Sequence, residues 1–396
     1  MKILLISDNY PPENNALSNR AYANSRYLSK HHDVSVLTCF PNYPFGKIFK
    51  NYNQKKIILK EEEENIKIFR IKTYIAKKNN GILSFLDYLS FGINSFLFSF
   101  FLKKDLIIAS SPPLPVAFFS LLASKITFTK NILEVRDIWS DSIYELGISR
   151  NLLSIKILKL IELICYKLAD KIFCVTETMR QKIISHGINP DKILIRPNGY
   201  IKLKNNFKKS NLELHFARHK NYTNFTFIGT IGESQDFQIL LDISIFLKNE
   251  KVIFNIIGEG SRFLWLKENI KKRNIKNIFL FSQKKYNNNL TIYKDIDYFF
   301  SFLKKIKIFE SVIPSKIYDH IYQKKITLFY GPKGEASKMI NTNKFGYSTH
   351  NQAELLNKIR FLNSNKNKIV FPRSNTYYFS REHVALNMIK DINKMQ

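Results

Sequence analysis

The chain has 396 residues, of which 45% are hydrophobic and 24% are charged. This is the composition of a globular protein, and it excludes a disordered, collagen-like or coiled-coil chain. At about 150 residues per domain, the length predicts two domains. Three cysteines are too few for a disulfide framework, so we expect free thiols. The apolar run at 2–6 is too short for a signal peptide, so we expect no export.

The charge is strongly positive, with 62 Lys and Arg against 32 Asp and Glu, a net charge of +30. Such an excess suggests an anionic partner, which could be nucleic acid, phospholipid or a phosphorylated substrate. An AT-rich genome also produces Lys-, Ile- and Asn-rich chains without selection for binding. The lysines are dispersed and form no basic stripe interleaved with aromatic residues, which argues against nucleic acid.

Short apolar segments alternate with helix-forming segments through the first half of the chain. We expect a helix at 18–30 and strands at 2–6, 34–38, 105–109, 131–135, 171–175 and 193–196. Buried apolar strands that alternate with helices are typical of a parallel sheet built from βαβ units.

The alternation is interrupted over 200–222, a polar and cationic segment, where we place the domain boundary. It then restarts, with expected helices at 235–248, 261–272 and 315–323 and strands at 224–228, 252–257, 277–281, 297–301 and 326–330. The sequence therefore predicts an α/β protein of two doubly wound, Rossmann-like domains, at 1–200 and 201–378. We expect the ligand in the cleft between them, beyond the carboxyl ends of the strands.

Residues 82–102 are almost wholly apolar and long enough to cross a membrane. Asp87, Gly92 and Asn94 inside the segment, and the strand pattern after it, argue against a span. Lysines flank the segment at 77–78 and 103–104. We therefore expect an in-plane or partly inserted helix at an anionic membrane surface, with a plain core helix and a true span as alternatives.

The segment 309–331 contains the most informative local pattern. Pro314 ends the preceding segment, Ser315 is expected to cap the next helix, and Lys316 falls in its first turn. A lysine there opposes the helix dipole unless an anion compensates, and a helix N-terminus offers free N–H groups to a diphosphate. Asp319 lies one turn further on the same face, where it can accept hydrogen bonds from two ribose hydroxyls. An ordinary capped helix with a solvated lysine is the alternative.

Two glycine-containing turns follow predicted strands in this half of the chain. Gly229, Thr230 and Gly232 follow the strand at 224–228, and Glu259 lies between two glycines after the next strand. Small residues allow the backbone to approach a phosphate, although neither turn matches a P-loop or G-x-G-x-x-G. A turn without a ligand is the alternative.

Acidic and aromatic residues crowd the loop after the strand at 131–135. Asp137 comes directly after the strand end, where doubly wound folds place reactive groups. Arg136, Trp139 and Asp141 are its neighbours in sequence. Such a loop suits sugar hydroxyls and an apolar ring face, and a helix N-cap network is the alternative.

Metal binding has little support in the sequence. Asp295 and Asp297 spell D-x-D, a triplet that chance supplies easily and that here precedes a strand. The eight histidines show no metal-ligand spacing. We therefore expect neither a metal nor another cofactor.

Motifs along nearly the whole chain resemble glycosyltransferase family 4, which has the GT-B fold. The likeness is strongest to bacterial O-antigen and capsule transferases that handle N-acetyl-L-fucosamine. The matching segments are Pro11-Pro12-Glu13 with Arg20, 34–48, Asp137-Ile138-Trp139, Pro197-Asn198-Gly199, Gly229-Thr230-Ile231-Gly232, Gly258-Glu259-Gly260 and Ser311-Val312-Ile313-Pro314-Ser315-Lys316. The last is the most specific to this subgroup. Where many members have two glutamates eight positions apart, this chain has Ser311 and Asp319.

The resemblance implies a retaining, metal-independent transfer of a sugar, such as N-acetyl-L-fucosamine, from a UDP-sugar. The implied acceptor is an undecaprenyl-diphosphate-linked saccharide of O-antigen or capsule synthesis. The enzyme would be cytoplasmic and peripherally attached to the anionic inner-membrane surface, which fits the positive charge and the apolar segment at 82–102. The second domain would bind the nucleotide and the first the acceptor, with a final helix at about 379–396 packed back on the first domain.

Within this framework Lys316 and Asp137 are the expected catalytic residues. Lys316 and N–H groups at 229–232 and 315–316 would stabilise the leaving UDP, and Asp137 would position the acceptor or the donor sugar. Arg20 would add positive charge on the phosphate side, and Asp319 would fix the ribose. The other expected substrate-binding residues are Asn198, Gly229, Thr230, Gly232, Glu259, Ser311, Ile313, Pro314 and Ser315. A non-catalytic or polyanion-binding basic protein is the alternative.

Overall fold

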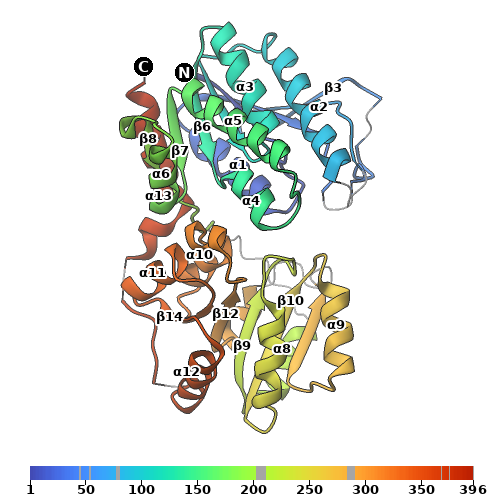
Figure 1. Ribbon diagram of the computed structural model, residues 1–396, viewed down its shortest axis with the longest axis vertical. Helices are drawn as coiled ribbons and strands as arrows, with labels where there is room; N and C mark the ends of the chain where they lie inside the picture. Colours follow the sequence, from blue (N-terminus) through green and yellow to red (C-terminus); the bar gives the residue numbers. More distant parts are fainter. Residues whose placement is uncertain are drawn as a thin grey trace. The chain divides into compact units, whose positions relative to one another are not determined.

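The computed structural model describes residues 1–43, 46–52, 55–76, 81–201, 211–282, 290–366, 368–373 and 375–395. The chain divides into two compact units, which we call unit 1 (Met1–Asn198 and Arg381–Gln396) and unit 2 (Gly199–Ser380). Each unit has its own sheet with helices on both faces (Figure 1). The predicted α/β class, with two doubly wound Rossmann-like units, is confirmed.

The sheet of unit 1 has the strand order β3-β4-β2-β1-β5-β6-β7-β8. Its strands are β1 (Lys2–Ile6), β2 (Asp33–Cys39), β3 (Ile58–Glu63), β4 (Ile66–Ile71), β5 (Leu106–Ser111), β6 (Lys130–Val135), β7 (Lys171–Cys174) and β8 (Ile193–Ile195). The pairs are parallel apart from the antiparallel pair of β3 and β4. The chain order reverses between β1 and β5, which makes the carboxyl ends of these strands the switch point where such sheets bind ligands.

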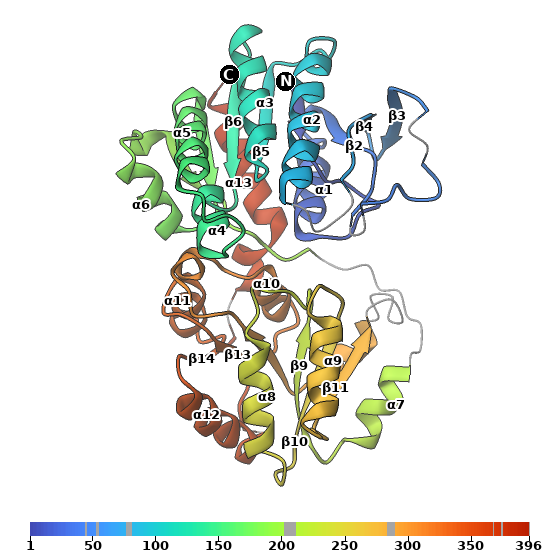
Figure 2. The same ribbon diagram turned by 45° about the vertical axis from the view of Figure 1, so that its right-hand side comes forward.

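The central strands of this sheet are buried on both faces, which explains why β1 and the first part of β5 are apolar runs. Ile3 and Leu5 pack with Met388, whereas Leu4 and Ile6 pack with Phe91 on the opposite face. The helices of the first face are α1 (Ala16–Leu28) and α13 (Arg381–Asn393). On the second face α2 (Gly81–Ser99), α3 (Leu114–Ile126) and α5 (Leu152–Leu168) lie side by side, with α4 (Trp139–Glu145) and α6 (Glu177–Ser185) beside α5 (Figure 2).

The sheet of unit 2 is parallel and has the strand order β11-β10-β9-β12-β13-β14. Its strands are β9 (Thr223–Ile228), β10 (Val252–Gly258), β11 (Ile278–Ser282), β12 (Tyr298–Phe302), β13 (Thr327–Tyr330) and β14 (Gly346–Thr349). Its helices are α7 (Asn211–Arg218), α8 (Phe237–Phe246), α9 (Phe263–Lys272), α10 (Ser315–Tyr322), α11 (Glu335–Thr342) and α12 (Gln352–Ser364). Here the chain order reverses between β9 and β12, so the loops after these strands flank the switch point.

Aromatic residues fill the centre of unit 2. The rings of Phe227 on β9 and Phe302 on β12 stack with centroids 5.0 Å apart, and Phe237 of α8 packs edge-on against both. Rings in these arrangements add specific attraction to the burial of apolar surface. This cluster fixes the ends of the two strands from which the loops at the switch point emerge.

The structure contains elements that the sequence pattern did not predict. Strand β3 has the sequence ILKEEE and lies mostly exposed at the edge of the sheet, so it lacks the apolar run of a buried strand. The helix expected at 18–30 spans Ala16–Leu28, because the Asn15 side chain accepts a hydrogen bond from the Ser18 N–H and caps the helix.

Two predictions fall partly or wholly outside the described residues: the boundary at 200–222 and the lysine pair at 77–78.

Helix α2 contains the apolar segment and packs closely on α3. A Cβ atom built on Gly92 would lie 2.9 Å from the carbonyl oxygen of Pro115 and from a ring carbon of Phe119, so only glycine permits this approach. In the part of the chain that the structure describes, α2 is the one helix with enough length and apolar character to cross a bilayer. Its packing nevertheless makes it part of the helix layer of unit 1.

Candidate active site

The start of α10 differs in one detail from the expectation. Pro314 occupies the N-cap position and Ser315 is the first helical residue, without a capping hydrogen bond from its side chain. The prediction that Ser315 caps the helix is therefore wrong: the proline lacks an N–H and ends the preceding segment one residue earlier. The N–H groups of Ser315 and Lys316 have no hydrogen-bond partner among the described residues. They remain available to an anion.

The side chain of Lys316 extends back from α10 across the end of β9. Its Nζ lies 3.7 Å from the centroid of the Phe227 ring, and a Cβ built on Gly229 would lie 3.2 Å from its Cε and Nζ. Gly229, with φ of 146°, has a backbone conformation that other residues rarely adopt. The glycine therefore leaves room for the lysine at the switch point between β9 and β12.

The ammonium group of Lys316 forms no hydrogen bond or ion pair within the described residues. Burial lowers the pKa of Lys316 to about 7, and the nearby carboxylate of Asp319 offsets only part of this shift. A cation that is poorly solvated and unpaired gains most from an incoming anion. This arrangement can hold a phosphate group.

The two glycine turns interlock next to this lysine. A Cβ built on Gly258 would lie 1.9 Å from the carbonyl oxygen of Gly229, and one on Gly260 would lie 2.2 Å from that of Ile231. The Ile231 N–H donates to the Glu259 carbonyl oxygen at 2.8 Å. These glycines therefore let the loops after β9 and β10 pack directly on each other.

The backbone of 229–232 offers fewer free donors than expected. The Gly229 N–H donates to the Ile257 carbonyl oxygen at 3.0 Å, and the Ile231 N–H donates to the Glu259 carbonyl oxygen. The Gly232 N–H donates to Gln235 Oε1 at 2.9 Å. Only the N–H of Thr230, an exposed residue, has no partner among the described residues. We expected all N–H groups of this turn to be available to a phosphate. Only the N–H of Thr230 is, because the N–H groups of Gly229, Ile231 and Gly232 donate to protein oxygens.

The remaining expected residues of unit 2 have mixed environments. The Ser311 hydroxyl donates to the Ile308 carbonyl oxygen at 2.8 Å, and the residue is only 1% exposed, so its hydroxyl is not presented to a ligand. Glu259 accepts a hydrogen bond from the Ser282 hydroxyl. Ile313 and Pro314 are half-buried in the segment before α10.

Asp319 is exposed on α10. Burial raises the pKa of Tyr293 to about 12, and the negative charge of Asp319 adds to this increase.

Asp297, the second acid of the D-x-D triplet, accepts a hydrogen bond from the Asn224 N–H at 2.8 Å and pairs with Lys366 at 2.8 Å. It therefore has a structural role at the start of β12. The first acid, Asp295, ends a short 3-10 helix and is exposed.

Sequence reasoning missed a second cation at this edge. Lys304 lies two residues after β12, donates its backbone N–H to the Ser234 carbonyl oxygen at 2.9 Å, and pairs with Glu233 at 3.3 Å. Arg262, at the start of α9, lies 3.6 Å from the same carboxylate. The position of Lys304 just after an apolar strand could have suggested this role, because strand ends on both sides of a switch point converge.

Arg20 has a different environment from the one expected. The residue is only 1% exposed, and its guanidinium donates to Glu134 at 2.7 Å, to Asn198 Oδ1 at 2.8 Å and to the Arg196 carbonyl oxygen at 3.1 Å. Asn198 Oδ1 also accepts from Arg381 at 3.0 Å. These contacts fit a buried ion pair that joins α1, β6 and α13, and they leave Arg20 little capacity to bind phosphate.

Asp137 is placed as expected at the carboxyl end of β6. Burial raises its pKa to about 6, opposed by the neighbouring Arg136. Asp8 follows β1 at the switch point of the same sheet, and burial, together with Asp87 and Glu13, raises its pKa to about 8. Asp8 was not predicted, although its place directly after the first apolar strand is the same feature that identified Asp137.

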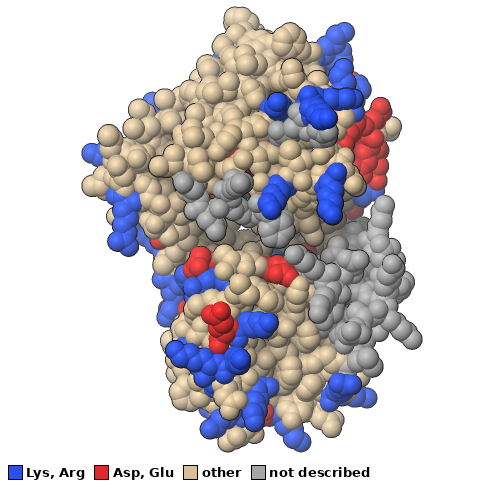
Figure 3. Space-filling view, turned by 90° about the vertical axis from the view of Figure 1, so that its right-hand side faces the viewer, with Lys and Arg blue, Asp and Glu red and all other residues tan. Residues whose placement is uncertain are grey.

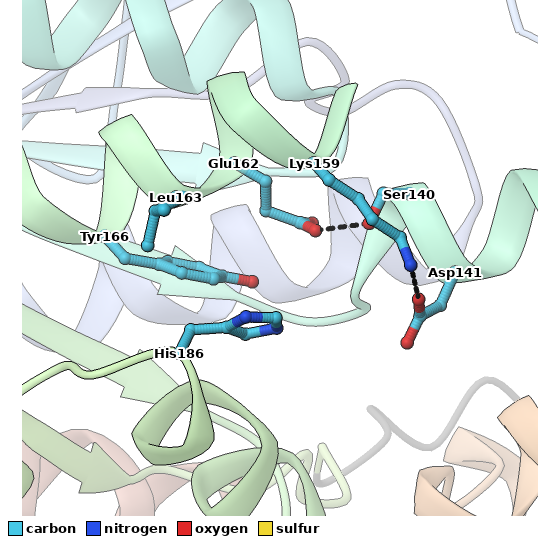
Figure 4. Close-up of a pocket in the computed structure, with 7 residues that line it drawn as sticks. All are labelled: Ser140, Asp141, Lys159, Glu162, Leu163, Tyr166 and His186. Atoms are coloured by element: carbon cyan, nitrogen blue, oxygen red, sulfur yellow. Dashed lines mark hydrogen bonds and ion pairs between the residues drawn. The ribbon is translucent and has the colours of Figure 1, made fainter. Parts of the chain in front are cut away.

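A small cavity lies under α5, lined by Ser140, Glu162, Tyr166, His186 and others (Figure 4). Glu162 is buried there, and its carboxylate accepts hydrogen bonds from the Ser140 hydroxyl at 2.6 Å and from the Trp139 N–H at 2.9 Å. The carboxylate thereby satisfies an N–H group at the start of α4. The cavity volume of about 20 Å³ is sufficient for a water molecule. It is too small for a sugar.

Two Rossmann-like units, each with polar side chains at the carboxyl ends of a parallel sheet, define the GT-B fold. The solved structure of Anabaena Alr3699/HepE in complex with UDP-glucose matches the whole chain with a TM-score of 0.69 at 13% identity, and all of that chain is covered. WaaG, a glycosyltransferase involved in lipopolysaccharide biosynthesis, matches with a TM-score of 0.61 at 10% identity, over 97% of this chain and 98% of that one.

Sequence comparison gives the same class. The chain is 24% identical to the putative colanic acid biosynthesis glycosyl transferase WcaI of Escherichia coli (strain K12) over 329 residues, 80% of each protein. No protein family model matches. The resemblance to glycosyltransferase family 4 is confirmed, and the chain is a GT4-like glycosyltransferase with the GT-B fold. Its preference for N-acetyl-L-fucosamine and its independence of metal stay predictions.

Proposed function

We propose that the protein transfers a sugar from a UDP-sugar to a lipid-diphosphate-linked saccharide in the synthesis of a surface polysaccharide. The observation that carries this proposal is the unpaired ammonium of Lys316 at the switch point of unit 2. Two similar proteins support it: HepE is solved in complex with UDP-glucose, and WcaI is named for colanic acid biosynthesis.

Unit 2 would bind the nucleotide. Lys316, the N–H groups of Ser315 and Lys316, and the N–H of Thr230 would hold the diphosphate. Asp319, one turn along α10, would accept hydrogen bonds from the ribose hydroxyls. As the bond from the anomeric carbon to the β-phosphate breaks, negative charge grows on the phosphate, and the lysine stabilises that charge.

Unit 1 would bind the acceptor. The carboxylate of Asp137 would accept a hydrogen bond from the acceptor hydroxyl and orient its oxygen toward the anomeric carbon. The new glycosidic bond would form there as the bond to the β-phosphate breaks, and the hydroxyl proton would pass to the leaving diphosphate. Trp139 and Tyr88, whose rings meet edge to face at 6.1 Å, would offer an apolar surface to a sugar ring. We propose that the transfer retains the anomeric configuration and needs no metal.

Donor binding can be tested on the purified protein by calorimetric titration with UDP and with a panel of UDP-sugars, including UDP-N-acetyl-L-fucosamine. We expect binding in the presence of EDTA and release of UDP when a lipid-diphosphate saccharide is supplied. NMR of the product reports the anomeric configuration. A protein that binds no UDP-linked compound would contradict the proposal, whereas a different preferred sugar would revise only the donor.

We further propose that α2 attaches the enzyme to an anionic membrane. Exposed apolar side chains follow the outer side of this helix and its C-terminal end: Ile82, Phe85, Leu86, Ile93, Leu97, Phe100 and Phe101. Figure 3, which views the molecule from the side of α2, shows a broad uncharged surface on unit 1 with lysines and arginines along its border. The one acid of the helix, Asp87, accepts a hydrogen bond from the Ala76 N–H at 2.9 Å. Apolar side chains bordered by cations suit the interface of an anionic bilayer.

A further inference from the structure

A second apolar surface lies on unit 1, at the connection between α4 and α5. Tyr144, Leu146, Ile148, Leu152 and Leu153 are exposed in this stretch, the last two to 67%. Monomeric soluble proteins rarely expose so many large apolar side chains in sequence, and such patches mark contact surfaces. We call residues 144–153 the elbow.

The apolar surface continues from the elbow along α5. Leu153, Ile157 and Leu160 follow one another at helical spacing on the exposed side and are 67%, 49% and 58% exposed. The opposite side of the helix is buried through Ile155, Cys165 and other residues. We call Leu153, Ile157 and Leu160 the α5 stripe.

Cations predominate beside the stripe, where Asp141 and Glu145 are the acids that precede it in the sequence. Residues 146–161 contain no Asp or Glu, but they contain Arg150, Lys156 and Lys159, all exposed. Lys159 lies 3.5 Å from Asp141, whereas no ion pair of Arg150 or Lys156 is found within the described residues. Long cationic side chains next to an apolar stripe can reach lipid phosphates while the stripe enters the acyl region.

The start of α4, which leads into the elbow, contacts α2. The edge-to-face contact of Tyr88 on α2 with Trp139 on α4 joins the first half of α2 to the segment that leads into the elbow. Both α2 and α5 pack against α3 on the same face of the sheet (Figure 2). The carboxyl end of β6, with Asp137, comes just before α4.

We propose that the elbow and the α5 stripe form a second contact with an anionic lipid bilayer, beside that of α2. This inference rests on the proposed membrane attachment and extends it, because two apolar elements on one face would fix the orientation of unit 1 at the surface. The carboxyl edge of its sheet, where the lipid-linked acceptor would bind, then lies next to the lipid.

Site-specific fluorescence tests the contact directly. Cys39, Cys165 and Cys174 are all buried, so a cysteine introduced by Ile157→Cys can be labelled selectively with an environment-sensitive fluorophore. Vesicles that contain phosphatidylglycerol should shift its emission to the blue, and lipids with a quencher in the acyl chain should quench it. The control is Leu264→Cys on α9 of unit 2, which is 69% exposed and should show neither effect.

A second measurement uses the full chain with the triple change Leu153→Ser, Ile157→Ser and Leu160→Ser. We expect its partition into phosphatidylglycerol vesicles to fall about 10-fold or more, with unchanged UDP binding. The same vesicle assay with Phe246→Ser and Leu264→Ser should match the wild type.

Three outcomes would overturn the inference: an unshifted label at position 157, wild-type vesicle binding by the triple variant, or a change in its oligomeric mass alone. The last result would assign the stripe to a second copy of the chain. Failure of UDP binding in the wild-type protein would instead contradict the proposed function, so the two failures are distinguishable.

Discussion

The ammonium nitrogen of Lys316 lies 3.7 Å from the centroid of the Phe227 ring at the end of β9. A cation over an aromatic face is attracted by the ring's charge distribution, though less strongly than by water and a counter-ion together. The ring therefore holds the lysine in place before a ligand arrives and leaves its hydrogen-bonding capacity unused. This is the arrangement expected of a preorganised anion site.

Replacing Lys316 by methionine should remove the charge and keep the side-chain volume. We expect UDP to bind at least about 10-fold more weakly and transfer to slow by about 100-fold. Calorimetric titration and an assay of UDP release give the two numbers. Lys338→Met, at an exposed position of α11, is the matched control and should leave both unchanged. Wild-type turnover of Lys316→Met would exclude a role for the lysine at the leaving group.

UDP binding should depend on pH through Lys316. The pKa of about 7 in the free protein means that part of the population carries a neutral lysine near pH 7. A bound diphosphate favours the charged form and raises this pKa, so binding takes up protons and weakens as the pH rises above about 7. Titrations in buffers with different ionisation enthalpies measure the proton uptake. The Lys316→Met variant should lose it, and equal uptake by both proteins would contradict the assignment.

Replacing Asp137 by asparagine should stabilise the protein and impair transfer. Its pKa is raised from 3.8 to about 6, so between these values the folded state binds more protons than the unfolded state and stability falls as the pH rises. At pH 7 the buried charge is a net cost, and its removal should raise the free energy of unfolding by about 1 kcal/mol. Urea unfolding at pH 7 measures this gain. The control Asp141→Asn removes a carboxylate that is paired with Lys159 and Lys182, and it should give no gain.

A methyl group at Gly258 should disrupt the interlocked turns of unit 2. The new Cβ would lie 1.9 Å from the carbonyl oxygen of Gly229, so the backbone must move. We expect a loss of about 3 kcal/mol in the free energy of unfolding, and weaker UDP binding because Gly229 adjoins Lys316. Gly81→Ala, where nothing lies within 4 Å of the new atom, should change stability by less than about 0.5 kcal/mol. Similar effects of the two changes would argue against the close approach.

Arg20→Met separates a structural role from a phosphate-binding role. The change leaves the buried carboxylate of Glu134, 2.7 Å from the guanidinium in the wild type, without its counter-ion. We expect a loss of about 3 kcal/mol or more in stability, partly recovered by adding Glu134→Gln. UDP affinity, measured at a temperature where the variant is folded, should stay unchanged. A large loss of affinity in a folded variant would restore the role of Arg20 on the phosphate side.

Much of the fold could be predicted because the buried strands carry their pattern in the sequence. The run around Leu4 is apolar on both sides, because its sheet is covered by helices on both faces. Strand β9 is also buried, but it alternates Phe225 and Phe227 with the polar residues Asn224 and Thr226. Strand β3 could not be found in this way, because its exposed edge position tolerates the charged sequence ILKEEE.

The candidate site was predictable where one short segment contains it. Pro314, Lys316 and Asp319 lie within the first two turns of one helix, so their relation follows from helical spacing alone. Lys304 and Asp8 follow strands that lie at a switch point of their sheets. The position of a switch point depends on the order of the strands in the sheet, and no local sequence pattern predicts that order. The hydrogen-bond use of Gly229 and Gly232 depends likewise on the neighbouring loop and on Gln235, which spacing does not reveal.

Helix α13 belongs to unit 1 although it ends the chain, so unit 2 is nested within unit 1. The first and last residues of unit 2 lie side by side, because the Tyr200 N–H donates to the Phe379 carbonyl oxygen at 2.9 Å. During translation all of unit 2 leaves the ribosome before the other unit has its last helix. One continuous stretch of the gene thus encodes unit 2, whereas unit 1 is assembled from two stretches that lie on either side of it.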